Sequence, residues 1–210
     1  MLRGPDYDPV TQTISVLAAY GTPGFWVMTG ALPALGACHL LTAWGLRAAG
    51  TAGRVGLGAG GVSAWAVALL PAPSSGGSLR HGAVAVVAVV LLAGWPVLAV
   101  EGGGAAPWCL RPAPCVVVTV FMGVGGAWFL VEMHRQGVVG VAERVVAAVQ
   151  LVWSFVVAVP CLHGSRGRGR QTVGQEAGVG RGAGCVFMGC GWCGGGVGCW
   201  KAWVRVVMWG

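Results

Sequence analysis

The chain is short of the charged and polar residues that cover soluble proteins. Charged residues make up 9% of its 210 residues, and it contains one lysine and no asparagine. A soluble globular domain carries about 25% charged residues. This shortage excludes a surface that faces water on every side, and it indicates that the chain is solvated by lipid.

Basic residues are also scarce in the body of the chain. Residues 1–163 hold seven Arg and five acidic residues, a net charge of +2, whereas residues 164–210 hold six Lys or Arg and one Glu, a net charge of +5. A nucleic-acid surface needs basic residues gathered on a folded face. We therefore expect no nucleic-acid partner.

Motifs that bind nucleotides, catalyse hydrolysis or hold zinc are missing as well. The sequence has no Walker loop, no G-x-S-x-G and no H-E-x-x-H. Its only C-x-x-C pair is Cys190 and Cys193, and a zinc ribbon wants two such pairs at a suitable separation. We expect no cofactor, no metal site and no assignable catalytic residue.

What the chain does have is long apolar stretches. Five of them lack Asp, Glu, Lys and Arg and approach the roughly 20 residues that a bilayer core requires. Short connections join them, which favours antiparallel neighbours. The sequence predicts an all-α, polytopic transmembrane helical bundle whose spans lie at about residues 25–46, 55–73, 82–100, 113–131 and 145–162.

Small residues replace Leu at many positions in these spans. Gly56, Gly60 and Ala64 recur at a spacing of four, which places them on one helical face. In lipid, a face of small residues lets helix backbones approach closely. We expect this face to be a helix–helix contact.

The segment before the first span has an amphipathic pattern. Asp8 and Pro9 are typical of a helix start, with Asp8 as the N-cap and Pro9 at the first helical position. Val10, Ile14 and Leu17 then share one face. The pattern predicts a short amphipathic turn or helix lying on the membrane surface.

Tryptophans gather near the ends of the predicted spans. Trp44, Trp108 and Trp153 have this position. Trp is enriched where the bilayer meets water. We expect these three side chains to form part of an aromatic belt.

Composition changes abruptly after His163. The stretch 164–210 is rich in Gly, Arg, Cys and Trp and shows neither apolar periodicity nor a run of spanning length. The sequence therefore predicts two regions, a transmembrane domain at 1–163 and a low-complexity tail at 164–210. The tail is either a disordered extension or the product of a shifted reading frame.

Several sequence blocks carry a family resemblance. They are YDPVTQTISVLAA (7–19), GFWVMTGALPALGACHLLTAWGLR (24–47), LRHGAVAVVAVVLLAGWPVLA (79–99), PWCLRP (107–112) and GVAERVVAAVQLVWSFVV (140–157). Over about residues 5–160 the chain resembles the bacterial membrane family called domain of unknown function 998, common in actinobacteria. The resemblance implies a bundle of about six helices with no established activity.

The chain differs from that family in two places. Members of that family usually have one more helix before the DPVTQTIS block, so this chain is expected to lack the family's first helix. The tail after residue 163 has no counterpart in the family.

Polar residues within spans are costly in lipid, which makes each one a candidate for function. His39 and Thr42 lie three residues apart and share a face. They could form a proton-responsive pair or a ligand contact. Alternatively, His39 holds the bundle together by a hydrogen bond to a neighbouring helix.

A polar or small stripe marks the last span. Glu143, Ala147, Gln150 and Ser154 follow one another on one helical face. The stripe is either an interfacial anchor with interhelical hydrogen bonds or, with His39 and His81, the lining of a polar cavity. His81 on its own suits an interfacial position.

Three functions remain open from the sequence. The first is a non-enzymatic structural, sensory or lipid-interacting membrane protein, and the second is a small-solute transporter or permease. The third is an intramembrane enzyme that modifies lipid. In each case we expect a multi-pass protein of the bacterial inner membrane whose partners are membrane lipids, with helix–helix oligomerisation left open.

Overall fold

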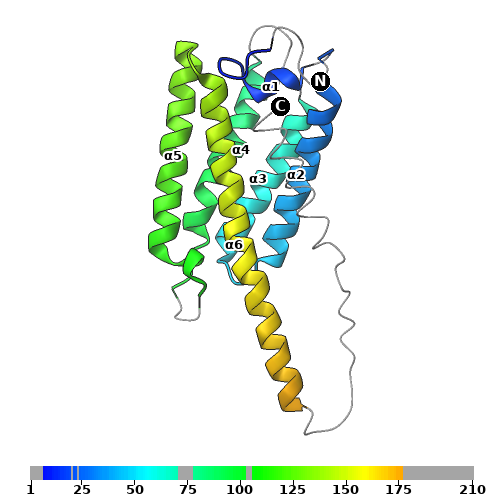
Figure 1. The fold of residues 1–210 in the computed structure, drawn as a ribbon, viewed down its shortest axis with the longest axis vertical. Coiled ribbons are helices and arrows are strands. Elements are labelled where there is room, and N and C mark those ends of the chain that lie inside the picture. Colours follow the sequence, from blue (N-terminus) through cyan, green and yellow to red (C-terminus); the bar gives the residue numbers. More distant parts are fainter. Residues whose placement is uncertain (1–6, 20, 23, 71–77, 103–105, 177–210) are drawn as a thin grey trace.

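The fold is a bundle of helices (Figure 1). The computed structural model describes residues 7–19, 21–22, 24–70, 78–102 and 106–176, and no strand occurs within these ranges. The elements are α1 (Ile14–Leu17), α2 (Phe25–Gly45), α3 (Thr51–Leu69), α4 (Leu79–Leu98), the 3-10 turn η1 (Trp108–Leu110), α5 (Pro112–Arg135) and α6 (Val139–Glu176).

Each long helix packs against the next one along the chain. Thus α2 contacts α3, α3 contacts α4, α4 contacts α5 and α5 contacts α6. In addition, α1 contacts α6. The helices alternate in direction, so the bundle has two ends. We call them the α1 end, where α2, α4 and α6 begin, and the η1 end, where α3 and α5 begin (Figure 1).

Helix ends follow local sequence signals. Ser78 caps α4, because its hydroxyl accepts a hydrogen bond from the His81 N–H at 3.3 Å. Pro112 begins α5, where a missing N–H costs nothing. The helix ends at Arg135, and its C-cap Gln136 has φ +55°. Glu132 accepts the Val138 N–H at 2.9 Å where the chain turns into α6.

Four helices are long and apolar enough to cross a membrane. They are α2, α4, α5 and the part of α6 from Val139 to Cys161. The prediction of five spans is not confirmed, because α3 is not among the four. Five glycines and Arg54 make α3 less apolar than its neighbours. Arg54 donates to the carbonyls of Ala43 (2.9 Å) and Trp44 (3.3 Å), so it caps the end of α2.

The last helix runs further than the sequence predicts. The pattern places the end of the last span at residue 162, but α6 continues to Glu176 and extends beyond the η1 end (Figure 1). The division of the chain at residue 163 stays a prediction. Most of the expected tail, residues 177–210, lies outside the described residues.

Small residues hold α3 between α2 and α4. Gly56, Gly60 and Ala64 are buried, as the sequence predicts. A Cβ built on Gly60 would lie 2.6 Å from the Leu92 side chain of α4, and one on Gly56 would lie 3.4 Å from Trp95. The expected helix–helix contact of this face is confirmed.

The other side of α3 approaches α2 just as closely. A Cβ on Gly61 would lie 2.7 Å from the carbonyl oxygen of Gly36, and one on Gly36 would lie 2.6 Å from that of Gly61. Only glycine permits this separation of two backbones. Glycines on two sides of α3 therefore set the spacing of three helices.

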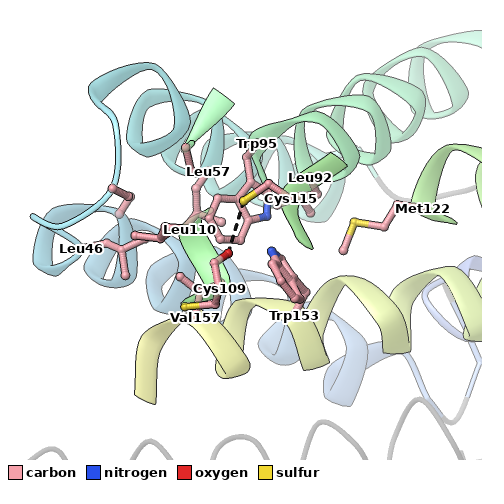
Figure 2. Packing of buried hydrophobic residues seen from close by; sticks show 13 residues of the cluster. Leu46, Leu57, Leu92, Trp95, Cys109, Leu110, Cys115, Met122, Trp153 and Val157 are labelled. Carbon is pink, nitrogen blue, oxygen red and sulfur yellow. Dashed lines mark hydrogen bonds between the residues drawn. The ribbon is translucent and has the colours of Figure 1, made fainter. Parts of the chain in front are cut away.

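The core lies toward the η1 end (Figure 2). Trp95 of α4, Cys109 and Leu110 of η1, and Val157 of α6 are fully buried there. Trp153 belongs to the same cluster and is only 8% exposed, so its placement in an aromatic belt is wrong. The reason is that Trp153 lies in the middle of the candidate span Val139–Cys161 and packs in the core cluster rather than at a bilayer surface. Trp44 and Trp108 are exposed, 70% and 56%, as a belt requires.

Two alanine substitutions in α3 test this packing. A Cβ on Gly53 would collide with the backbone of Ala99, which cannot rotate away, whereas one on Gly58 would make ordinary contacts of 3.7 and 3.8 Å with Ala43 and Leu40. We expect Gly53→Ala to destabilise the protein by about 1–3 kcal/mol. Gly58→Ala should be neutral or stabilise it by up to about 1 kcal/mol, because Ala is the better helix former.

Thermal unfolding of both variants in the same detergent measures the difference. Equal midpoints for Gly53→Ala and Gly58→Ala would show that backbone contact does not set the spacing of α3 and α4.

Candidate functional site

The polar groups at the α1 end form a network around the N-terminal segment, residues 7–19. This segment begins with a turn rather than a helix. Asp8 accepts hydrogen bonds from the Val10 N–H at 3.0 Å and the Thr11 hydroxyl at 2.6 Å. The prediction that a helix begins at Asp8 and Pro9 is wrong, because these two bonds close a turn and α1 begins only at Ile14. The Thr11 hydroxyl and the Val10 N–H lower the pKa of Asp8, so the turn is strongest while this carboxylate is ionised.

Apolar side chains anchor the segment in the bundle. Ile14, Leu17 and Ala18 are buried against Met28 of α2, and Ala147 of α6 packs on the same cluster. Val10 remains 43% exposed, so the face predicted from its spacing to Ile14 and Leu17 is only partly buried. The segment therefore lies between helices and not on a lipid surface alone.

Glu143 caps α1 from another helix. Thr13 precedes α1 but makes no side-chain capping bond. Instead, the Glu143 carboxylate on the first turns of α6 accepts the Ile14 N–H at 2.5 Å. The first N–H groups of a helix have no partner within the helix, and an acidic group is favourable there. Two residues 129 positions apart thus form one helix cap.

Arg144 binds the backbone of the same segment. Its Nη1 donates to the carbonyls of Pro9 and Gly140, both at 2.8 Å. Its Nη2 donates to the Tyr7 hydroxyl at 2.5 Å, and its guanidinium lies 6.0 Å from the centre of the Tyr7 ring. The Tyr7 hydroxyl in turn donates to the Thr13 carbonyl at 3.3 Å. A planar cation with several donors suits such a set of acceptors.

Gly140 allows this contact to form. Its N–H donates to the Val10 carbonyl at 3.0 Å. A Cβ at this position would collide with the carbonyl oxygens of Pro9 and Gln12. The start of α6 and the N-terminal segment therefore touch backbone to backbone.

His81 joins the segment to α3 and α4. Its Nδ1 lies 2.6 Å from the Leu70 carbonyl, and its Nε2 lies 3.3 Å from the Ser15 hydroxyl. Because a carbonyl only accepts, Nδ1 donates to Leu70, and Nε2 pairs with the Ser15 hydroxyl, which can either donate or accept. His81 and Glu143 thus hold neighbouring parts of one segment, at Ser15 and Ile14.

Comparison with known protein families gives one match. Residues 1–160 match the family described as "Protein of unknown function (DUF998)". The chain belongs to the DUF998 family. The searches of curated proteins and of solved structures found no match. The matched range contains the N-terminal segment and the start of α6, so both partners of the polar network belong to the DUF998 region.

The remaining polar candidates of this DUF998 protein lie apart from the network. Gln150 is buried, and its amide donates across helices to the Val89 carbonyl at 3.3 Å. The hydroxyl of Ser154 donates to the Gln150 carbonyl at 2.9 Å, within α6. Gln150 of the predicted stripe thus bonds to α4, and Ser154 bonds within α6.

The pair on α2 is not joined by a hydrogen bond in the structure. The Thr42 hydroxyl donates to the Cys38 carbonyl of its own helix at 2.7 Å. His39 is 3% exposed and faces Gly61 of α3, and its Nδ1 has no hydrogen-bond partner. His39 lies 14 residues into α2, deeper in the bundle than His81 and Glu143, which lie within the first turns of their helices.

The polar side chains at the α1 end contact the protein itself. Within the described ranges no group of three or more His, Cys, Asp or Glu residues could hold a metal ion. Glu143, Arg144 and His81 are engaged by backbone or hydroxyl groups of the N-terminal segment. The network can hold that segment in place.

Sequence reasoning identified Glu143 and His81 but missed Arg144, Gly140 and Tyr7 as parts of one site. One signal was available. The blocks at 7–19 and 140–157 both carry the family resemblance, and the second holds an adjacent acid and base in an otherwise apolar stretch. Nothing in the sequence says that the two blocks meet, because more than 120 residues separate them.

Replacing Glu143 tests the helix cap. Glu143→Ala leaves the Ile14 N–H without its acceptor, which costs about 1–3 kcal/mol. We expect faster hydrogen exchange at the amides of α1, measured by mass spectrometry in detergent. Glu143→Gln keeps an acceptor oxygen and should recover most of the protection. Glu101→Ala is the control, since Glu101 is exposed at the η1 end, and exchange as fast in this control would contradict the role of Glu143.

Gly140→Ala tests the backbone contact. The added methyl group meets two carbonyls of the N-terminal segment, so the segment should detach from α6. We expect limited proteolysis to cut within residues 7–19 several times faster than in the parent protein. Gly82→Ala is the control at the same end, because a Cβ there meets nothing within 4 Å. Unchanged cleavage in Gly140→Ala would rule out this contact as the anchor.

Proposed function

We propose that this DUF998 chain is a non-enzymatic, lipid-interacting protein of the bacterial inner membrane with five spans. The four apolar helices and the family match indicate an integral membrane protein of a family of unknown function. The bacterial inner membrane is what the family resemblance implies. Lipid interaction rests on a groove between α5 and α6.

The fifth span in this proposal is α3. It lies antiparallel between α2 and α4, which are both candidate spans, and its 19 residues extend about 28 Å. This length is close to the thickness of the hydrocarbon core, about 30 Å. Its glycines face α2 and α4 rather than lipid, so they do not argue against a membrane position.

The groove is the observation that carries lipid interaction. It has a volume of about 230 Å³. Its walls come from two candidate spans, so its surroundings are the hydrocarbon of the bilayer. The lining residues are Phe121, Met122, Val124, Gly125, Trp128, Val145, Val146 and Val149. No charged or hydrogen-bonding group other than the Trp128 indole lines it, which suits an acyl chain.

The polar residues support this function better than the alternatives. A transporter needs a polar path through the bundle, and an intramembrane enzyme needs convergent acid, base or metal groups. Glu143 and His81 bind the N-terminal segment, and Gln150 binds the Val89 carbonyl of α4. Each of these polar bonds holds two parts of the protein together, which is a structural role.

A photoreactive lipid tests the groove. The protein is reconstituted with a phospholipid that carries a diazirine in one acyl chain, and adducts are located by peptide mass spectrometry. We expect adducts to concentrate on residues 121–128 and 145–149, above those on the exposed apolar face of α4. Val145→Trp fills the groove and should lower this yield several-fold.

The control is Val152→Trp on the same face of α6, two turns below. Val152 is 51% exposed and does not line the groove, whereas Val145 is 40% exposed and does. An equal drop for both variants, or adducts spread evenly over all exposed helices, would contradict a specific lipid contact. Cross-links between two copies at this groove would instead indicate oligomerisation.

A further inference from the structure

Four buried polar atoms in the described part of the chain have no hydrogen-bond partner. They are His39 Nδ1, Trp95 Nε1, Thr119 Oγ1 and Trp153 Nε1. Each lies 14 to 16 residues from the α1 end of its helix, on α2, α4, α5 and α6. Buried polar groups are normally satisfied, and an exception calls for a specific cause.

Trp95 and Trp153 are the pair that shares one environment. Both belong to the core cluster at the η1 end, and they are 0% and 8% exposed. Figure 2 shows the indole nitrogen of Trp153 pointing toward the Trp95 side chain, between α4 and α6. An indole N–H only donates, so the two rings cannot satisfy each other. They need an acceptor.

An incompletely used acceptor lies in the same cluster. The Cys109 carbonyl of η1 accepts a hydrogen bond from the Cys115 thiol at 3.2 Å (Figure 2), and Cys109 belongs to the same buried cluster as the two tryptophans. A thiol is a weak donor, and a carbonyl oxygen has two lone pairs. The Cys109 oxygen can therefore take a second, stronger hydrogen bond.

We propose that Trp95 and Trp153 hold one shared water molecule, which donates to the Cys109 carbonyl. Water can accept from both indoles and still donate to the carbonyl. Three partners are typical of a buried water in a protein. A monatomic anion would also accept from the indoles, but it would be repelled by the carbonyl and would place a charge in an apolar core.

The site lies near the η1 end. Trp95 lies three residues before the end of α4, and Cys109 belongs to the connection between α4 and α5. The water links α4, α6 and this connection by hydrogen bonds, so it would help to hold the three together at the η1 end. This inference is independent of the proposed lipid contact, which lies between α5 and α6.

Nuclear magnetic resonance of protein carrying isotope-labelled tryptophan tests the site. Trp95→Phe and Trp153→Phe assign the two indole N–H signals. We expect both signals to show cross-relaxation with a long-lived water, and we expect each substitution to shift the signal of the other indole. Trp44→Phe is the control near the same end, because Trp44 is 70% exposed and lies outside the cluster.

Two results would overturn the inference. One is indole signals that show no water contact, and the other is signals that move when chloride replaces sulfate, which would indicate an anion. If the Phe variants do not fold, Cys115→Ala replaces them. Loss of the thiol leaves the Cys109 carbonyl entirely to water, so both indole signals should shift, and unchanged signals count against the site.

Discussion

Contact between glycine backbones sets the geometry of this bundle. Gly36 and Gly61 bring α2 against α3, and Gly53 brings α3 against Ala99 just after α4. In lipid, helices gain little from burying apolar side chains, because the lipid chains are apolar too. Close packing must then supply the attraction, and only small residues allow it. The remaining helices, α5 and α6, continue from this three-helix layer, and the large core side chains Trp95 and Leu57 fill the space beside it.

The helical class and most helix positions follow from the sequence, since charge-free apolar stretches of this length have few other solutions in a membrane. Gly56, Gly60 and Ala64 show how far this reasoning extends, because their spacing alone identifies a packed face. This reasoning did not extend to Arg54. Because spans were predicted from stretches without charged residues, Arg54 was placed outside a span, although its side chain reaches the carbonyls that end α2. A residue count records a charge but not where a long side chain places it.

The polar site was harder to predict for a different reason. Glu143 and His81 were found because ionisable residues are rare near the ends of spans. Their partners are mainly backbone groups, such as the Ile14 N–H and the Leu70 carbonyl, and every residue type has those. Asp8 was misassigned because an Asp-Pro pair suits both a helix start and a turn, and here its hydrogen bonds to Val10 and Thr11 close a turn. Trp153 was misassigned because tryptophan in general favours the bilayer surface, whereas this side chain lies mid-span and packs in the core.

The cap that Glu143 provides for α1 has a consequence for the order of assembly. Ribosomes deliver residue 14 long before residue 143, and the two lie 129 positions apart. During synthesis α2 to α5 are made before Glu143, so the first amides of α1 lack this acceptor until α6 follows. Contacts of such long sequence separation form late and slowly. Among the described helices, α6, which is made after the others, is therefore the one that locks the N-terminal segment.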